Sequence, residues 1–556
     1  MPNYFSVGFL CRHPSEQCSG NSHLGRVIIA FMQLLFFLTL LVMVSGIILS
    51  NNGISGNANG IADRVLNVDT GIWYPTIQSA ISAPSTANGH TLSVTVGTYN
   101  ENIIITKSLT IIGVDAASTI IDGNKLDRVI NISAEANVTI SNVTVQNGVV
   151  YGQDGGGIYN QGTLTLVDGH VSSNWANGTL GGGGICNTGV LGVINSTVIG
   201  NESAGIFWNI GIGIANSGIL TVTNSTISNN TETSSSHVGG SIYNTGVATV
   251  LGTTLSNNGC AGIWNHIGST MTLVDSTVSH NDGLDVGGIY NQGTMTVAHS
   301  IVKGNSVATY GSKPFGEAGG ILNHSVLSVV SSTISSNSTC ETGGGVYNDG
   351  TLVMSNSTVD HNEHLCFPSS SGGGIANTGT LAITNSTLSH NTSDVGSGLF
   401  VNSGAVSLNG ITVAYNISAQ SGGGIFQSAG TIEMQNTIVA RNVGGQSPDC
   451  KGTVVSLGYN LLGNNTGCIF TPTSGDIVGT SGTPVDPLLG PLGNYGGPNL
   501  TVGLIPGSLA IDAGNPATCL STDQRGFVRQ GTCDIGSYEF GIGPGVSLTY
   551  LPTVLK

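Results

Sequence analysis

The chain has 556 residues, of which only 8% are charged and 85 are glycine, and its formal net charge is −16. Between residues 150 and 445 the basic residues are Lys303, Lys313 and Arg441 alone, which excludes the basic stripe that nucleic-acid binding requires. Regularly spaced aliphatic residues run through most of the chain, which argues against a disordered protein despite the high glycine content.

The first predicted element is an apolar run of 23 residues, 27–49, within an N-terminal segment of residues 1–50. At 1.5 Å per residue it would be about 35 Å long, enough to cross the ~30 Å hydrocarbon layer of a bilayer. Arg12 and Arg26 precede it, so the N-terminus is expected to stay inside and the rest to be exported. A cleaved signal peptide and a retained signal-anchor both fit, and both predict an extracellular or cell-surface location.

The next predicted elements are a linker and the first coils of a solenoid. Residues 51–70 are rich in glycine and asparagine and are expected to be a linker. Residues 71–150 are predicted to hold an N-terminal cap and the first coils, with one short amphipathic helix over 76–81 and strands over 92–96, 103–105, 109–112 and 138–140. A cap is expected because an open solenoid end exposes unpaired strand edges.

The central block, residues 151–442, is a repeat. The phrase G-G-G-I-Y-N-x-G-x-L-x-V-x-x-S-T-I-S-x-N recurs eleven times between Asp154 and Asn442, in steps of 21 to 32 residues. A period of this size indicates a solenoid, and uneven steps indicate loops of variable length at one corner of each coil. The first Asn of the phrase is assigned to Asn160, Asn187, Asn216, Asn244, Asn265, Asn291, Asn323, Asn348, Asn377 and Asn402, with Gln427 in the last copy.

Apolar residues inside each copy alternate with small polar ones, which is the periodicity of strands. Three short strands are predicted in the first copy, through Ile158, through Leu164 and Leu166, and through Val171, with glycine and asparagine at the turns. Like residues would stack from coil to coil as aliphatic and asparagine ladders. The predicted fold is therefore all-β, a parallel β-helix whose eleven coils would extend roughly 50 Å at ~4.8 Å per coil.

Ten cysteines are present, which suits an oxidising compartment. Cys450 with Cys468 and Cys519 with Cys533 each flank a compact loop and are predicted to form local disulfides. Cys340 and Cys366 lie one coil apart and are predicted to join neighbouring loops, whereas Cys186 and Cys260 have no evident partner. No Cys-x2-Cys occurs, so zinc binding is not indicated.

The repeat fades after Asn442. Residues 443–541 hold many prolines and both compact cysteine loops, and are predicted to be a separate module. Residues 542–556 form an apolar tail that is too short to span a bilayer.

Two segments resemble known families. Residues 76–113, T-I-Q-S-A-I followed by V-G-T-Y-N-E-N-I-I-I-T-K-S-L-T-I-I-G, resemble the opening coils of bacterial surface proteins with a right-handed parallel β-helix of the pectin-lyase-like superfamily. Residues 449–539 resemble the choice-of-anchor Q domain, through strings that include S-L-G-Y-N-L, N-Y-G-G-P, I-D-A-G, D-Q-R-G and C-D-I-G-S-Y-E. The resemblance implies an exported bacterial protein with a module that precedes surface-sorting tails, and implies no particular reaction.

The superfamily includes pectate lyases and polygalacturonases, so an enzyme is the alternative interpretation. Polygalacturonases would require Asn-Thr-Asp, Asp-Asp and Gly-His-Gly motifs, and none occurs here. A lyase would need clustered Ca²⁺-binding aspartates and a basic residue that abstracts a proton, for which Lys303, Lys313 and Arg441 are the candidates in the repeats. Fold alone does not confer the activity, so no catalytic residue is assigned.

The residue after each inward-facing Ile is expected to face outward, because side chains alternate along a strand. Aromatic residues hold this position in several copies, including Tyr243, Trp264, Tyr290 and Tyr347, with Val401 assigned to it in a later copy. An exposed row of them could stack on sugar rings of an extracellular polysaccharide or a cell-surface glycan. The alternative is that the rings pack on one another or lie under the variable loops.

Acidic residues follow the closing Asn on successive coils: Asp282, Asp285, Glu317, Glu341, Glu363 and Asp394. They suggest either a Ca²⁺-binding edge or charges that maintain solubility and prevent edge-to-edge association. No other cofactor is indicated. His280, His361 and His390 each precede a closing Asn, and solvated side chains explain them better than a metal site.

These observations predict an exported protein that is attached to the membrane or envelope. The expected role is non-catalytic, either adhesion to a glycan along the rod or a rigid surface stalk. A polysaccharide lyase or glycoside hydrolase is the competing class.

Overall fold

The computed structural model describes residues 64–204, 210–233, 239–307, 309–310, 313–314, 316–364 and 371–543. This part of the chain is an all-β parallel solenoid of about 13 turns with a short helix, α2 (Ile77–Ser82). The apolar run 27–49 and residues 544–556 of the tail lie outside the described residues. In the ranges that are described, no helix is long and apolar enough to cross a membrane.

The N-terminal end carries the expected cap. Helix α2 begins after Thr76, whose hydroxyl accepts a hydrogen bond from the Ser79 N–H, and it buries Ile77, Ala80 and Ile81. Beside it, β1 (Val65–Asn67) pairs antiparallel with both β2 (Ile72–Tyr74) and β3 (Thr91–Val94). The antiparallel strands and the helix cover the first parallel edge, and β1 falls within the segment expected to be a linker.

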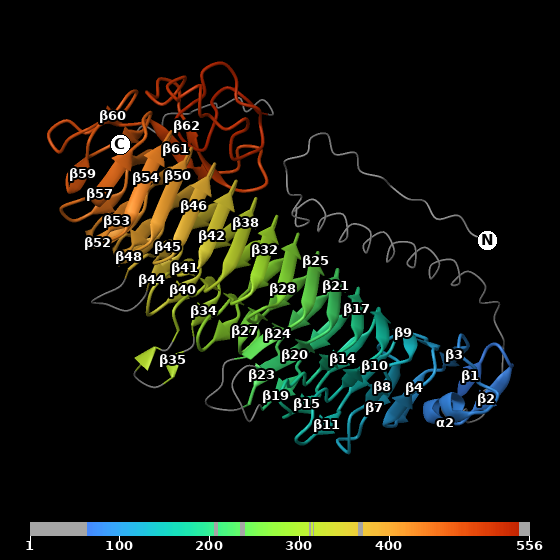
Figure 1. Ribbon diagram of the computed structural model, residues 1–556. Helices are drawn as coiled ribbons and strands as arrows, with labels where there is room; N and C mark the ends of the chain where they lie inside the picture. The colour runs from blue at the N-terminus through green and yellow to red at the C-terminus, as the bar shows by residue number, and fades with distance from the viewer. Residues whose placement is uncertain are drawn as a thin grey trace, which may run out of the picture. The chain divides into compact units, whose positions relative to one another are not determined.

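Each turn of the repeat contains the three predicted strands. In the first copy they are β12 (Ile158–Asn160), β13 (Thr163–Val167) and β14 (His170–Ser172). Each strand pairs in parallel with its equivalent in the next turn, so that Ile158 lies beside Ile185, Leu164 beside Leu191 and Val171 beside Val198. The strands stack from α2 at the blue end to β60 (Ile477–Val478) at the orange end (Figure 1).

Three long parallel sheets result, named C, A and B in the order in which each turn enters them. Sheet C contains β5 (Ile103–Ile105), β8 (Ile130–Ile132), β12, β16 (Ile185–Asn187), β20 (Ile210–Asn216), β24 (Gly239–Asn244), β27 (Ala261–Asn265), β31 (Ile289–Asn291), β37 (Ile321–Asn323), β41 (Val346–Asn348), β45 (Ile375–Asn377), β49 (Leu399–Val401) and β53 (Ile425–Gln427). Sheet A contains β3, β6 (Thr110–Gly113), β9 (Asn137–Ser141), β13, β17 (Val190–Ile194), β21 (Ile219–Thr223), β25 (Val247–Leu251), β28 (Thr270–Val274), β32 (Thr294–Ala298), β38 (Val326–Val330), β42 (Thr351–Ser355), β46 (Thr380–Thr384), β50 (Ala405–Asn409) and β54 (Thr431–Gln435). Sheet B contains β4 (Gly97–Asn100), β7 (Thr119–Asp122), β10 (Thr144–Gln146), β14, β18 (Thr197–Ile199), β22 (Thr226–Ser228), β26 (Thr254–Ser256), β29 (Thr277–Ser279), β33 (Ile301–Lys303), β39 (Thr333–Ser335), β43 (Thr358–Asp360), β47 (Thr387–Ser389), β51 (Thr412–Ala414), β55 (Ile438–Ala440), β58 (Leu461–Leu462) and β60.

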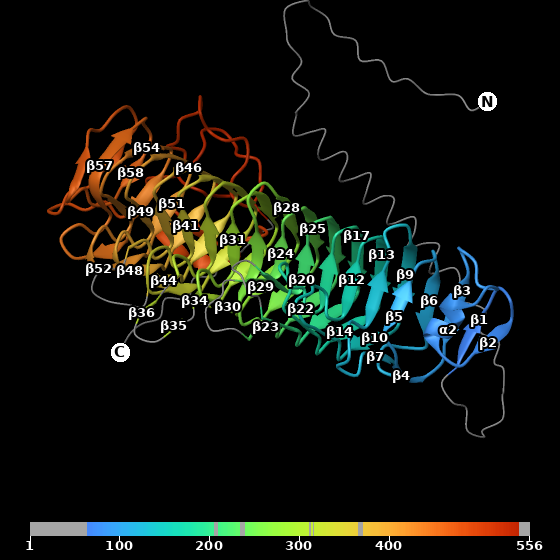
Figure 2. The same ribbon diagram turned by 60° about the horizontal axis from the view of Figure 1, so that its bottom comes forward.

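A fourth, very short strand follows sheet B in most turns and was not predicted. Sheet D contains β11 (Val149–Val150), β15 (Trp175–Ala176), β19 (Glu202–Ser203) and β23 (Thr231–Glu232). Sheet E contains β30 (Asp282–Gly283), β34 (Ser306–Val307), β40 (Ser338–Thr339), β44 (Glu363–His364), β48 (Thr392–Val395), β52 (Ile417–Ser421) and β56 (Val443–Gly444). Figure 2 shows strands β30 to β52 along one side of the solenoid.

The parallel stacking continues past Asn442. Strand β57 (Cys450–Ser456) pairs with both β53 and β54, which joins sheets A and C, and then with β59 (Cys468–Phe470). The chain next forms the antiparallel pair β61 (Leu489–Gly493) and β62 (Thr501–Leu504). Figure 1 shows this red segment beside the strands of the last turns.

The core follows the predicted alternation. In β21, for example, Leu220 and Val222 are buried while the residues between and beside them face outward. The inward aliphatic side chains of sheets A, B and C form one continuous cluster from Val65 to Leu462. Burial of this apolar surface is the main stabilising contribution, at roughly 25 cal/mol per Å².

The first asparagine ladder runs along the ends of the sheet C strands. From Asn160 to Asn348 each side-chain amide donates to the Oδ1 atom of its equivalent in the next turn, at 2.7–2.9 Å. The assignment of Asn402 to this ladder is wrong, because Val401 lies in register with Asn377. Val401 is fully buried, and Asn402 lies in the bend directly after β49. The outward position that had been assigned to Val401 is therefore held by Phe400.

A second ladder follows the sheet B strands and contains the closing asparagines. It runs through Asn174, Asn201, Asn230, Asn258, Asn281, Asn305, Asn337, Asn362, Asn391, Asn416 and Asn442, and ends on Asp449. Each of these side chains also bonds backbone groups of adjacent turns, as Asn305 does with Val278 O at 3.0 Å. The ladder therefore satisfies buried backbone groups at a corner where strand pairing is interrupted.

Candidate functional site

Three of the predicted aromatic residues lie on adjacent strands of sheet C. Tyr243, Trp264 and Tyr290 are in register on β24, β27 and β31. Their ring centroids are 5.8 Å apart for Tyr243 and Trp264 and 4.7 Å apart for Trp264 and Tyr290. With Val286, Ala318 and Leu322 they form a cluster separate from the main core, on the outside of the sheet.

Of the two alternatives for these three rings, an exposed row or rings packed on one another and under the loops, the packed arrangement is the one present. Only 4% of Tyr243, 3% of Trp264 and 8% of Tyr290 is accessible to solvent. The segments that enter sheet C through Val286 and Ala318 cover them, and mutual packing of the rings removes the rest of their surface. The three side chains lie on the outer side of sheet C but are covered there, whereas Tyr347 on β41 is half-buried.

The structure places two of the predicted acidic residues beside this aromatic cluster. Asp285 and Glu317 occupy equivalent positions in successive turns, since the Glu317 N–H donates to the Asp285 carbonyl at 3.0 Å and the next residues, Val286 and Ala318, form a bridge. Burial raises the pKa of Asp285, and the neighbouring charge of Glu317 raises it further. Burial also raises the pKa of Glu317.

Residues of the next turn complete the arrangement. His324 Nδ1 lies 2.7 Å from Asp349 Oδ1, and His324 Nε2 lies 3.9 Å from Glu317 Oε2. The His324 ring packs edge-on against Tyr290, with centroids 5.3 Å apart. We define the aromatic–acidic patch as Tyr290, His324, Tyr347, Asp285, Glu317 and Asp349.

A chain of polar contacts adjoins the patch at Tyr290. Trp264 Nε1 donates to Gln292 Oε1 at 3.1 Å, and Gln292 Nε2 donates to the Tyr290 hydroxyl at 2.8 Å. These two bonds fix the orientation of the Trp264 indole and the Tyr290 hydroxyl. His324, Glu317 and Asp349 keep between a quarter and half of their side-chain surface exposed, at 27%, 49% and 39%.

Sequence reasoning missed His324, Asp349 and Gln292. Each follows the predicted aromatic position of its own turn by two residues, as Gln292 follows Tyr290 and Asp349 follows Tyr347. Residues two apart on a strand share a face, so extending the alternation by one more step past the ladder asparagine would have placed them with the aromatic residues.

The other predicted acidic residues do not join the patch as one edge. Asp282 lies on β30 and accepts a hydrogen bond from Ser306 Oγ at 2.9 Å, and Glu363 lies exposed on β44. Glu341 is close enough to Glu317 for its charge to raise the pKa of Glu317. Within the described ranges no group of three or more His, Cys, Asp or Glu residues is arranged to hold a metal ion. Ca²⁺ binding along this edge therefore has no assembled ligand set in this part of the chain.

The histidines that precede closing asparagines form a stack. The His361 and His390 rings are parallel with centroids 4.8 Å apart, and Tyr415 continues the stack at 5.3 Å. His361 Nδ1 lies 2.8 Å from Asp360 Oδ2, and burial raises the pKa of Asp360. The Tyr415 hydroxyl donates to the Leu489 carbonyl at 3.1 Å, so the stack supports the C-terminal segment.

Two of the three predicted disulfides are confirmed. Cys450 bonds Cys468 and Cys519 bonds Cys533, with Cα atoms 5.4 Å and 6.4 Å apart. Cys340 is disulfide-bonded, but its predicted partner Cys366 lies outside the described residues. Cys186 and Cys260 are buried free thiols, and burial raises the pKa of both.

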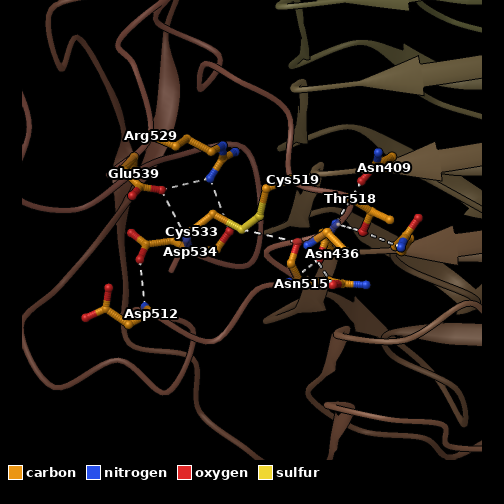
Figure 3. Close-up of a disulfide and its surroundings, with 12 residues drawn as sticks. Asn409, Asn436, Asp512, Asn515, Thr518, Cys519, Arg529, Cys533, Asp534 and Glu539 are labelled. Carbon is orange, nitrogen blue, oxygen red and sulfur yellow. Dashed lines mark hydrogen bonds and ion pairs between the residues drawn. A yellow bond between two sulfur atoms is a disulfide. The ribbon is translucent and has the colours of Figure 1, made fainter. Parts of the chain in front are cut away.

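The Cys519–Cys533 loop is attached to the solenoid. Figure 3 shows Asn515 and Thr518, which lie just before Cys519, against Asn436, which belongs to the turn between sheets A and B. The Asn515 N–H donates to Asn436 Oδ1 at 2.8 Å. On the other side of the disulfide, Arg529 pairs with Glu539 at 3.1 Å. The disulfide therefore joins a buried ion pair to the solenoid surface.

The C-terminal segment docks on the outer face of sheet B through buried polar residues. Gln524 Nε2 donates to Thr358 Oγ1 at 2.9 Å, and Ser537 Oγ donates to Thr412 Oγ1 at 3.1 Å. Between them, Thr387 Oγ1 lies 3.0 Å from Thr501 Oγ1. The D-Q-R-G and D-I-G-S-Y-E strings thus supply contacts that hold this segment on β43, β47 and β51.

An arginine organises the interior of that segment. Arg525 pairs with Asp523 at 2.7 Å, and both side chains are buried. It also donates to the Glu539 carbonyl at 2.7 Å and stacks over the Tyr538 ring at 3.8 Å from the centroid. A planar guanidinium suits this combination of ion-pair, hydrogen-bond and stacking contacts.

A pocket lies where the last turn meets the segment 484–486, and it is lined by Arg441, Asn442, Asp449, Asn464, Pro484 and Asp486. Arg441, a candidate lyase base, forms two hydrogen bonds to the Asp486 carboxylate, at 2.9 and 2.5 Å. Lys303, the second candidate, is exposed on β33, and the side chain of Lys313 lies outside the described residues. Neither Arg441 nor Lys303 lies in the aromatic–acidic patch.

Asp449 at the end of the second ladder gives a prediction of pH dependence. Burial raises its pKa from 3.8 to about 6, so the folded protein holds the proton more tightly than the unfolded chain. On this account the free energy of unfolding should rise as pH falls from about 6 toward 4, by roughly 2–3 kcal/mol at 1.36 kcal/mol per pKa unit. Denaturant unfolding at several pH values measures it, and Asp449→Asn should remove this contribution. An unchanged pH dependence in the variant would contradict the assignment.

Comparisons with known proteins are sparse. No family model matches the chain. A cell surface glycoprotein of Methanothermus fervidus is 41% identical over 71 residues, which are 13% of this chain and 11% of that protein. The crystal structure of pectate lyase Pel9A is similar at 13% sequence identity and a TM-score of 0.32, over 74% of this chain and 88% of that one. The chain thus matches only a small part of the curated relative, and the likeness to the lyase is too weak to carry an argument.

Proposed function

We propose that this protein is an exported, surface-held β-helix of the right-handed, pectin-lyase-like kind that binds an extracellular glycan without cleaving it. The single observation that carries the binding is the aromatic–acidic patch, in which Tyr290, Tyr347 and His324 lie beside three carboxylates on the outer face of sheet C. Aromatic faces stack on sugar rings, and carboxylates and amides accept and donate hydrogen bonds to sugar hydroxyls.

Several findings support the location. A short part of the chain is similar to a cell surface glycoprotein, and five disulfide-bonded cysteines suit an oxidising compartment. The apolar run 27–49 would export the chain, cleaved or retained. We propose further that residues 443–541 form a choice-of-anchor Q-like module at the C-terminal end of the solenoid.

The charge of the patch indicates the class of glycan. Asp285, Glu317 and Asp349 are acidic, and the chain as a whole has a net charge of −16. A polyuronate would be repelled from this surface, whereas a neutral or amino-sugar polymer would not. We therefore propose neutral or amino-sugar glycans as ligands, with adhesion to such a polymer as the role.

Affinity electrophoresis in gels that contain neutral, amino-sugar or uronate polysaccharides tests the proposal. Wild-type protein should be retarded by a neutral or amino-sugar polymer, and Tyr347→Ala should weaken that binding by about tenfold, because a stacking aromatic contributes of the order of 1–2 kcal/mol. Glu317→Gln should also weaken it. Glu363→Gln is the matched control, since Glu363 is an exposed glutamate on β44, outside the patch.

Retardation that is equal in wild type and Tyr347→Ala would contradict the site, and retardation by polyuronates alone would contradict the ligand class. The competing function is hydrolysis, which the neighbouring carboxylates Asp285 and Glu317 with raised pKa values favour. Release of oligosaccharides that is abolished by Asp285→Asn would replace the binding function with that activity.

A further inference from the structure

The outer face of sheet A carries no charged side chain on the strands from β21 to β50. From β21 to β50, eight successive strands each present three outward side chains. All of these are Thr, Ser, Val, Ile, Leu, Ala or Asn. We call this surface the sheet A face. Four of its aliphatic residues are well exposed: Ile219 at 41%, Val247 at 51%, Val326 at 49% and Val353 at 49%.

The sheet A face differs from the other two long faces. The C-terminal segment covers part of sheet B through Thr358, Thr387 and Thr412. Sheet C carries the aromatic–acidic patch. Among the described residues, carboxylates reach the sheet A face at its edges, where Asp275 follows β28 and Asp349 precedes β42, and at its C-terminal end, where Glu433 is exposed on β54 beside Ser407. A contiguous exposed surface with many aliphatic groups and charges at its rim is typical of a protein interface.

We propose that the sheet A face binds the same face of a second copy of this chain. The chain carries a net charge of −16, so two copies repel each other in most orientations. The sheet A face is where they can approach without placing carboxylates opposite each other. An interface that uses the same surface on both copies is the two-fold arrangement most common in homodimers.

The size of the face fits such an interface. Eight strands at ~4.8 Å spacing and five residues at ~3.3 Å give an area of roughly 40 by 17 Å, or about 650 Å² on each copy. Two copies would bury about 1,300 Å² together, within the range of specific interfaces. Sheets pack face to face at ~10 Å with interdigitating side chains. The β-branched Thr, Val and Ile that dominate the face have few rotamers and lose little freedom on docking.

Co-purification of two differently tagged full-length chains, expressed together, tests this proposal. The test variant is Thr272→Lys with Thr296→Lys, at the centre of the face on β28 and β32. The control variant is Thr254→Lys with Ile301→Lys, which adds the same charge at exposed outward positions of sheet B. Circular dichroism confirms that both variants keep the β-solenoid.

Wild type and the sheet B control should each recover the second tag, and the sheet A variant should lower the recovery at least tenfold. Cross-linked wild-type chains should have twice the 56.3 kDa mass of one chain. Equal recovery with all three proteins would overturn the proposal and assign any association to another segment, such as 27–49. Monomeric wild type that is retained on crystalline cellulose or chitin, with retention lost in the sheet A variant, would assign the face to a polysaccharide and would also overturn it.

Discussion

Asn305→Ala is expected to lower the free energy of unfolding by roughly 3–5 kcal/mol. Asn305 lies in the middle of the second ladder, where its Oδ1 atom accepts hydrogen bonds from the Asn281 N–H at 3.1 Å and the Asn281 side chain at 2.9 Å. Its amide donates to Val278 O at 3.0 Å and to Asn337 Oδ1 at 2.9 Å. Alanine would leave the buried Asn281 N–H without a partner, and would remove one hydrogen bond each from the Asn281 side chain, Val278 O and Asn337 Oδ1, at about 1–3 kcal/mol for each buried group affected.

Denaturant unfolding followed by tryptophan fluorescence measures this loss. Asn137→Ala is the control, because Asn137 is exposed on β9 and its replacement should change the stability by less than about 0.5 kcal/mol. A loss below about 1 kcal/mol for Asn305→Ala would show that water or a local shift satisfies the freed groups. In a solenoid each turn contacts mainly its neighbours, so hydrogen exchange should increase most in the turns beside residue 305.

Arg525→Met is expected to release the C-terminal segment from the solenoid, at a cost of roughly 3–5 kcal/mol. The Arg525 and Asp523 side chains are 1% and 0% exposed, so removing the arginine leaves a buried carboxylate without its counter-charge. The loss also breaks the contact to the Glu539 carbonyl and the stacking on Tyr538. Gln524 is the adjacent residue and donates a hydrogen bond to Thr358 on sheet B. Disorder at residue 525 should therefore also break this contact.

Limited proteolysis measures this release, with cleavage after residue 500 expected in Arg525→Met and absent in wild type. Arg441→Met is the matched control, because Arg441 pairs with Asp486 at the surface, where the two side chains are 45% and 50% exposed. A surface pair of this kind contributes about 0–1 kcal/mol. Protection of Arg525→Met equal to that of the control would show that the hydroxyl and amide contacts to β43, β47 and β51 hold the segment without the ion pair.

Arg525, unlike Arg441, is buried, and it belongs to one of the two charged C-terminal strings, D-Q-R-G and D-I-G-S-Y-E. Their charged residues Asp523, Arg525, Asp534 and Glu539 face inward and bond to one another or to the backbone. Burial raises the pKa of Asp534 to about 6, which is typical of a carboxyl enclosed by the fold. The strings therefore have a structural role in this chain, which is to close the segment and dock it on sheet B.

The repeat determined the strands because its signal is local. Alternation of Leu220 and Val222 with Thr221 and Thr223 specifies a strand and its buried face. Stacking of identical turns then places like residues over one another. The helix over 76–81, the three strands of each copy and two disulfide pairs could be predicted for this reason. The one-residue error at Val401 and Asn402 arose where the copy L-F-V-N departs from the phrase. This string can be aligned with the other copies either through its asparagine, Asn402, or through its first aliphatic residue, Leu399, and only the second alignment matches the strand pairing.

The candidate site depended on features that no single copy contains. Whether Tyr243, Trp264 and Tyr290 are exposed is decided by segments of neighbouring turns, which bring Val286 and Ala318 over the rings. The meeting of Asp285 and Glu317 with His324 joins loops of different length, 39 residues apart along the chain from Asp285 to His324. The amino-acid sequence by itself determined the solenoid and the direction in which each side chain points, because both follow from a period of two along a strand. Only the tertiary structure decided which of those side chains reach solvent and which charges meet, because variable loops, and not the repeat, cover and connect the outer faces.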